Sequence, residues 1–147
     1  MIISQIQIQH ILPVFALVLL TFGLAPVMLY RRIKAVKAGK IPVGYFKDYQ
    51  QHEPFLMPTD VQIAARNYVN LFEVPVLFYA LIPLLILTNT ADNVSLYFSW
   101  AFVASRYIHT YVHVSSNKLM LRMRIFIIGF FILFLLWARL GYQLITG

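Results

Sequence analysis

Three polar residues open an apolar segment near the middle of the chain. Arg66, Asn70 and Glu73 lead directly into the apolar run of residues 74–87. Each residue of an α-helix turns by about 100°, so the spacing i, i+4, i+7 predicts that the three side chains share one helix face. Ionisable groups at the edge of a membrane span are costly and mark candidate functional sites. The pattern predicts a polar site where this segment enters the membrane.

Two later segments add polar faces. Arg106, His109 and His113 have the spacing i, i+3, i+7 and are expected on one face of a helix. Arg122 and Arg124 open the last apolar segment and lie about 200° apart on a helix, so only one of them can face a given site. Together these faces bring roughly four cations against one carboxylate, and an anionic ligand would complete the site.

The composition is that of an integral membrane protein. Of 147 residues, 61% are hydrophobic and only 12% are charged, with a mean hydropathy of +0.75. The apolar residues come in blocks long enough to span a bilayer. The net charge of +7 comes from basic residues beside apolar segments, which points to a membrane surface rather than to nucleic acid. The chain has no cysteine, which excludes disulfides and a protein thiolate.

The order of apolar segments predicts an all-α fold with one domain over residues 1–147. Four transmembrane helices are expected at about 11–30, 61–87, 94–114 and 119–142, with a cytoplasmic loop at 31–60. Pro75 and Pro83 should kink the second helix. Basic residues follow the first and third spans but not the second, so both termini should lie on the non-cytoplasmic side. The membrane would be a bacterial inner membrane or the endoplasmic reticulum.

The residues alone leave other interpretations open. Arg66, Lys118 and Arg124 could be interfacial anchors, and Glu73 could form a structural ion pair with Arg66 or Arg106. The two histidines could simply donate to backbone carbonyls within the bundle. His109 and His113, with Glu73, have the composition of a two-histidine, one-carboxylate metal site, so a metal or haem protein is one alternative. Another alternative is a non-catalytic membrane protein that binds an anionic lipid or metabolite between its spans.

The pattern Arg-x-x-x-Asn-x-x-Glu of Arg66, Asn70 and Glu73 resembles the signature of the MAPEG family. These are the membrane-associated proteins of eicosanoid and glutathione metabolism. The basic loop after the first span and the polar third span match the family order, and Arg106 with His109 resembles its prostaglandin E synthase branch. The resemblance implies a homotrimer of four-helix subunits. Glutathione would lie between subunits near the cytoplasmic side, and lipophilic substrates would enter from the bilayer.

The resemblance also implies a function, a glutathione transferase or peroxidase. Arg122 falls where the family keeps the arginine that activates the glutathione thiol. The residues expected to bind glutathione are Arg66, Asn70, Glu73, Arg106, His109, His113 and one of Arg31 and Arg32. The chemistry agrees, because arginines suit the two carboxylates of glutathione, Glu73 suits its ammonium and a nearby cation favours its thiolate.

Two positions depart from the family pattern. His113 stands where the family has a tyrosine, and Val69 stands where prostaglandin E synthase has an arginine. These departures weigh against eicosanoid chemistry.

Overall fold

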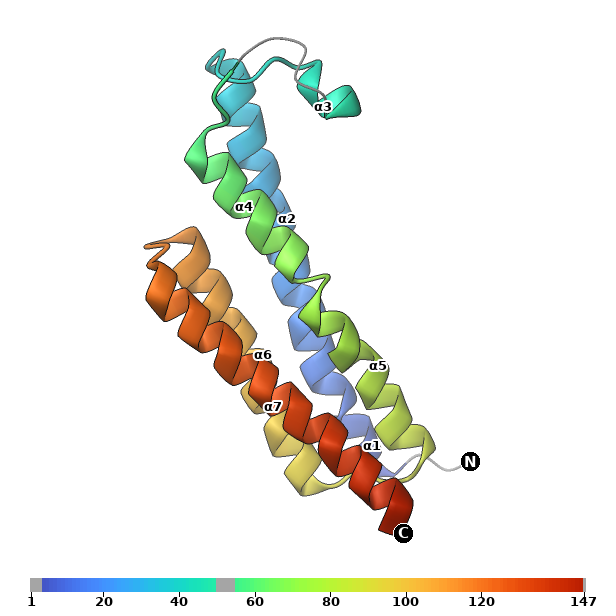
Figure 1. Cartoon of the computed structure of the whole chain (residues 1–147). Helices are drawn as coiled ribbons and strands as arrows, with labels where there is room; N and C mark the ends of the chain where they lie inside the picture. Colours follow the sequence, from blue (N-terminus) through green and yellow to red (C-terminus); the bar gives the residue numbers. More distant parts are fainter. Residues whose placement is uncertain (1–3, 50–54, 147) are drawn as a thin grey trace.

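The computed structural model describes residues 4–49 and 55–146, which fold into helices and connecting loops without a strand. The helices are α1 (Gln5–Gln9), α2 (Ile11–Lys37), α3 (Tyr45–Asp48), α4 (Thr59–Asn70), α5 (Val74–Leu87), α6 (Asn93–Val114) and α7 (Leu119–Thr146). They form four rods that lie side by side: α1 with α2, α4 with α5, α6, and α7 (Figure 1). The chain is therefore all-helical, as predicted.

Three of these rods are long and apolar enough to cross a membrane: Gln5–Lys37, Thr59–Leu87 and Leu119–Thr146. The predicted third span is present as α6, a helix of 22 residues, but it is not one of the three. Its sequence explains why, because seven of its ten buried residues are polar. The all-helical membrane class follows from these rods, whereas the count of four spans stays a prediction.

The two faces of α6 are reversed relative to a helix of a water-soluble protein. Its buried face carries Ser95, Ser99, Ser105, Arg106, His109, Thr110 and His113. Its outer face is apolar and aromatic, and Tyr97 and Tyr111 are each more than 70% exposed. Polar residues within a membrane turn toward the protein interior because hydrocarbon cannot hydrogen-bond to them. The faces of α6 therefore suit a helix surrounded by lipid.

The predicted second span over 61–87 is present as the membrane-length segment Thr59–Leu87, but it is broken rather than only kinked between Leu71 and Glu73, where α4 and α5 are separate helices. Glu73 has φ −94° and ψ −95°, outside the helical region. Pro75 accounts for the break, because proline cannot donate a backbone hydrogen bond and suits only the first turn of a new helix. Arg66 and Asn70 thus share the α4 face, but Glu73 does not belong to it. Pro83 lies inside α5, which continues past it.

The predicted loop over 31–60 is also shorter than expected, because α2 continues through the basic residues to Lys37. Tyr45 lies edge-on to Phe46 and Phe55, with ring centroids 5.3 and 5.1 Å apart. These aromatic residues pack against the small apolar cluster of Ala35, Ile41 and Val61. The described part of the loop therefore folds onto α2 and α4, whereas residues 50–54 lie outside the described residues.

The main apolar core joins α2, α5, α6 and α7 at the half of the bundle nearer α1. Phe78 stacks on Phe102 with ring centroids 4.9 Å apart, and both rings are fully buried. The other members of this core are Leu17, Leu81, Ile82, Leu85, Val103, Leu133, Leu136 and Leu140. The apolar core thus holds one half of the bundle together, and the predicted site residues lie toward the other half.

A polar clasp closes the end of the bundle where α5, α6 and α7 meet. Asp92 caps α6 by accepting from the Ser95 N–H at 2.8 Å, and it forms an ion pair with Arg139 of α7. His10 at the start of α2 contacts the Ser95 hydroxyl at 2.9 Å. Burial acts to raise the pKa of Asp92, but the hydrogen bonds from Ser95 and the Arg139 guanidinium together hold this pKa below its ordinary value.

This clasp predicts acid-sensitive stability. Because the folded-state pKa of Asp92 is lowered, its contribution is complete above the unfolded pKa of about 3.9 and is lost as the pH falls through the lower folded value. The melting temperature of the detergent-solubilised protein should therefore decline below about pH 4. Asp92→Asn can still cap α6, and it should lower the melting temperature at neutral pH and flatten this decline. An identical acid profile for both proteins would contradict the assignment.

Candidate functional site

The predicted site residues lie toward the end of the bundle where α2 and α6 end and α4 and α7 begin, here called the basic end. The basic residues at or near this end are Arg31, Arg32, Lys34, Lys37, Lys40, Lys47, Arg66, Lys118, Arg122 and Arg124. Arg139 lies at the opposite end, where it is paired with Asp92. The basic end is therefore strongly positive.

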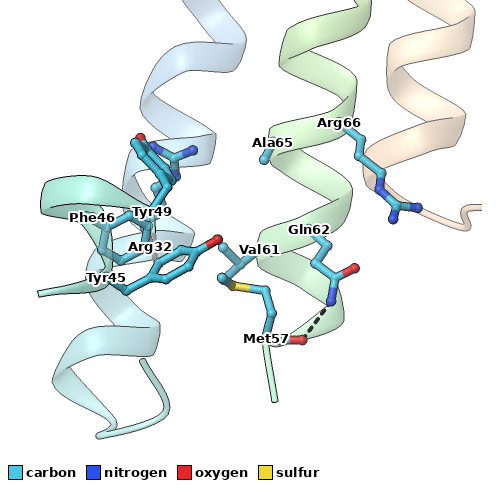
Figure 2. Close-up of a pocket in the computed structure, with 9 residues that line it drawn as sticks. All are labelled: Arg32, Tyr45, Phe46, Tyr49, Met57, Val61, Gln62, Ala65 and Arg66. Atoms are coloured by element: carbon cyan, nitrogen blue, oxygen red, sulfur yellow. Dashed lines mark hydrogen bonds between the residues drawn. The ribbon is translucent and has the colours of Figure 1, made fainter. Parts of the chain in front are cut away.

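On α4, Arg66 is exposed and Asn70 is half-buried. Figure 2 shows Arg66 turned away from the aromatic residues of the loop, on the side of α4 that faces a neighbouring helix. The helix α4 packs against both α2 and α6. The α4 face that carries Arg66 is therefore directed at the polar face of α6.

Asn67 is a polar residue that the sequence reasoning missed. It is fully buried, and neither atom of its amide has a hydrogen-bond partner among the described residues. The signal was present in the sequence, because Val61, Ala64, Asn67 and Leu71 form the buried stripe of α4. An amide in such a stripe needs a partner, and water, a ligand or a neighbouring subunit could supply it.

The polar face of α6, which the spacing of Arg106, His109 and His113 predicts, is buried. The rings of His109 and His113 lie 5.5 Å apart, and His109 Nδ1 lies 3.2 Å from the Arg122 carbonyl of α7. A carbonyl only accepts, so Nδ1 carries the proton, and the neutral ring has its lone pair on Nε2. His109 Nε2, Thr110 Oγ1 and both ring nitrogens of His113 have no partner in the described part of the chain. This face thus offers several unused acceptors and donors.

Arg106 is enclosed between α6 and α7, with only 2% of its surface exposed. Its guanidinium carbon lies 5.4 Å from the Phe102 ring and 5.2 Å from the Phe126 ring. The guanidinium donates to the Phe126 carbonyl at 3.2 Å and to the Ser105 hydroxyl at 3.4 Å. No described carboxylate contacts it. Arg106 is therefore a buried cation whose charge the described residues do not neutralise.

Arg122 and Arg124 point in different directions, as their spacing predicts. Arg122 is half-buried and donates to the Asn117 side-chain oxygen at 2.7 Å, whereas Arg124 is exposed. Asn117 has a φ of 46°, a left-handed conformation that asparagine tolerates, and it forms the turn between α6 and α7. The turn therefore holds Arg122 on the inner side of α7.

Arg31 and Arg32 have different surroundings. Arg31 donates to the Asp60 carbonyl and to the Val114 carbonyl, each at 3.0 Å, and so ties α2 to the start of α4 and the end of α6. The Arg32 guanidinium lies 5.3 Å from the centroid of the Phe46 ring. Arg32 also lines a cavity of about 360 Å³ between α2, α3 and α4, with Arg66 at its edge (Figure 2).

Glu73 is exposed in the break between α4 and α5 and forms no ion pair with a described residue. Residues 4–49 and 55–146 contain no group of three His, Asp or Glu that could hold a metal ion. The alternative set of His109, His113 and Glu73 is therefore not gathered in one place. The structure brings His109, His113 and Arg122 together, directs Arg66 toward α6 and leaves Glu73 exposed.

Comparison with known proteins defines the class of this chain. Residues 10–142 match the MAPEG family, nearly the whole chain. The chain therefore belongs to the MAPEG family and is a membrane protein of the group that acts in glutathione and eicosanoid metabolism. No curated protein and no solved structure shows significant similarity to it.

The unpartnered amide of Asn67 predicts a stabilising substitution. An unsatisfied buried polar group costs about 1–3 kcal/mol, and leucine has a similar volume without polar atoms. Asn67→Leu should therefore raise the melting temperature of the ligand-free protein in detergent. A lower melting temperature would mean that the amide is already paired, with water or with a neighbouring subunit.

Proposed function

We propose that this protein is a glutathione-dependent membrane enzyme, a transferase or peroxidase that acts on lipophilic substrates. One observation carries the proposal. In a chain of the MAPEG family, Arg106 and Arg122 lie on the inner sides of α6 and α7 without a described carboxylate partner. A positive potential in a low-dielectric region favours the binding of an anion.

Glutathione fits this charge pattern at its carboxylates. Each carboxylate suits a guanidinium fork, and Arg66 and Arg32 are the proposed partners. Arg31 is less suited, because it already donates to two backbone carbonyls. Asn70, His109 and His113 would add hydrogen bonds to the peptide groups, since His109 Nε2 and both nitrogens of His113 are unpartnered among the described residues.

The reaction depends on the thiol. Arg122 is proposed as the catalytic cation that favours the thiolate, because a nearby guanidinium lowers a thiol pKa from its usual value of about 8.5. In a transferase the thiolate sulfur would attack an electrophilic carbon and displace its leaving group. In a peroxidase it would attack the terminal oxygen of a hydroperoxide, breaking the O–O bond to release an alcohol, and a second glutathione would reduce the resulting sulfenic acid to glutathione disulfide and water. The substrate would come from the bilayer, because the outer faces of the rods are apolar.

The exposed Glu73 supports a site shared between subunits. A carboxylate at the edge of a membrane span is costly unless it meets a cation. In a homotrimer, Glu73 of one subunit could meet the ammonium of a glutathione held by the cations of its neighbour. The mass of the protein in mild detergent tests this assembly, and a monomer that still binds glutathione would contradict it.

The orientation in the membrane follows from the charges. The basic end would face the cytoplasm, so the glutathione site would open to the cytoplasm and both termini to the other side. A bacterial inner membrane and the endoplasmic reticulum both fit this orientation.

A second function has its own supporting observation. The cavity beside Arg32 and Arg66 combines cationic and aromatic lining, which suits the head group of an anionic lipid or a metabolite. A non-catalytic trimer of this kind would bind such a ligand without activating a thiol. Thiol chemistry therefore separates the two functions.

The two arginines of α7 provide a matched test of thiol activation. Arg122→Gln should raise the pKa of the thiol of bound glutathione. A rise of about one pH unit in this pKa lowers the thiolate-to-thiol ratio about tenfold at a given pH. The ultraviolet absorbance of the thiolate and the turnover of a generic electrophile should fall together. Arg124→Gln should leave both unchanged, because Arg124 is exposed. Loss of the signal in the Arg124 variant alone would contradict the assignment of Arg122.

A further inference from the structure

Gly129 of α7 lies against the buried Arg106 in a way that no other described glycine does. A Cβ atom at Gly129 would overlap Arg106 Nη2 and Ser105 Oγ and would lie 3.0 Å from the guanidinium carbon of Arg106. A Cβ atom at Gly141, on the same helix, would have no such neighbour within 4 Å. The missing side chain of Gly129 is therefore the space that the Arg106 guanidinium occupies.

The Arg106 guanidinium lies in a cradle that consists of Gly129 and Phe126 of α7 and Phe102 of α6. Phe126 is three residues before Gly129, so the two lie on the same face of α7. Phe126 supplies both a ring face and the carbonyl that accepts from Arg106, while Phe102 of α6 supplies the opposite ring. Aromatic faces and a carbonyl stabilise a cation without cancelling its charge. Gly129 admits the guanidinium to this cradle.

The cradle continues the polar contact between the two helices. His109 of α6 donates to the Arg122 carbonyl, one turn of α7 before the Phe126 carbonyl that Arg106 contacts. Arg106 and His109 thus form two successive hydrogen bonds from side chains of α6 to backbone carbonyls of α7. A displacement of the Arg106 guanidinium would move a positive charge relative to His109 and Arg122.

We infer that Gly129 is a positioning residue. It fixes the place of the Arg106 guanidinium, and the charge of this guanidinium adds to the positive electrostatic potential at the Arg122 side chain. This role rests on the proposed function in one respect, because the potential acts on the thiol of bound glutathione. Its first part, the coupling of Gly129 to Arg106, does not depend on glutathione. The two parts are therefore tested by separate readouts on the same variants.

The first readout is the melting temperature of the ligand-free protein in a double-mutant cycle. Gly129→Ala should lower the melting temperature, whereas Gly141→Ala, the matched control, should not. In an Arg106→Lys background Gly129→Ala should cost clearly less, because lysine has no Nη2 to collide with the new methyl group and only the overlap with Ser105 Oγ remains. If Arg106→Lys does not fold, Arg106→Met serves as the background. An equal loss in both backgrounds, or no loss in either, would overturn the coupling of Gly129 to Arg106.

The second readout is the pH titration of thiolate absorbance with glutathione bound to the detergent-solubilised protein. Gly129→Ala should move its midpoint upward, on the order of one pH unit or a tenfold change in the thiolate-to-thiol ratio. In the Arg106→Lys background it should move the midpoint no further. If the melting temperatures show that Gly129 and Arg106 are coupled but Gly129→Ala leaves the midpoint of the thiolate titration unchanged, the link between Gly129 and the thiol is overturned. If the wild-type protein binds no glutathione, the proposed function fails, and the melting cycle alone decides the role of Gly129.

Discussion

The burial of the Arg106 guanidinium without a carboxylate is the constraint on which the basic half of this protein depends. A buried guanidinium without a carboxylate is costly, and here the cost is offset by two aromatic faces, one backbone carbonyl and one hydroxyl. These groups accept hydrogen bonds from the Arg106 guanidinium or lie against it, but they do not neutralise its positive charge. The polar face of α6 must therefore turn inward, α7 must carry a glycine opposite the guanidinium, and the basic end attracts anions.

The two halves of the bundle are held together by different interactions. The half nearer α1 has a close-packed apolar core around Phe78 and Phe102, closed by the Asp92 and Arg139 pair. In the other half, Arg31 links three helices through backbone carbonyls, and buried polar atoms without a described partner lie on α4 and α6, at Asn67, His109, Thr110 and His113. Trp137, Arg139 and Gln143 of α7 have such atoms at the opposite end. The proposed function gives the polar atoms on α4 and α6 their partners, because bound glutathione would lie beside them.

Much of the fold could be predicted from the sequence, because blocks of apolar residues and helical spacing are local signals. The predicted face of Arg106, His109 and His113 is buried, and Arg122 and Arg124 differ in exposure as a separation of about 200° requires. The family prediction is confirmed over residues 10–142. The prediction that Glu73 shares a helix face with Arg66 is wrong, because Pro75 ends one helix and begins another.

Other features depend on contacts between helices, which spacing within one helix does not specify. Gly129 matters only because the register of α6 against α7 places it opposite Arg106, and the different surroundings of Arg31 and Arg32 depend on where α4 begins and α6 ends. Asn67 could have been found, because a polar residue interrupts the apolar stripe of α4.

The central claim is that the positive potential of the basic end is completed by the carboxylates of glutathione. Isothermal calorimetry on the protein in detergent, with glutathione and with its dimethyl ester, tests this claim most directly. The ester keeps the ammonium and the thiol but removes both negative charges. The account predicts that glutathione binds, that the ester binds at least about tenfold more weakly, a difference of about 1.4 kcal/mol, and that added salt narrows the difference. Equal binding of both compounds, or binding of neither, would contradict it.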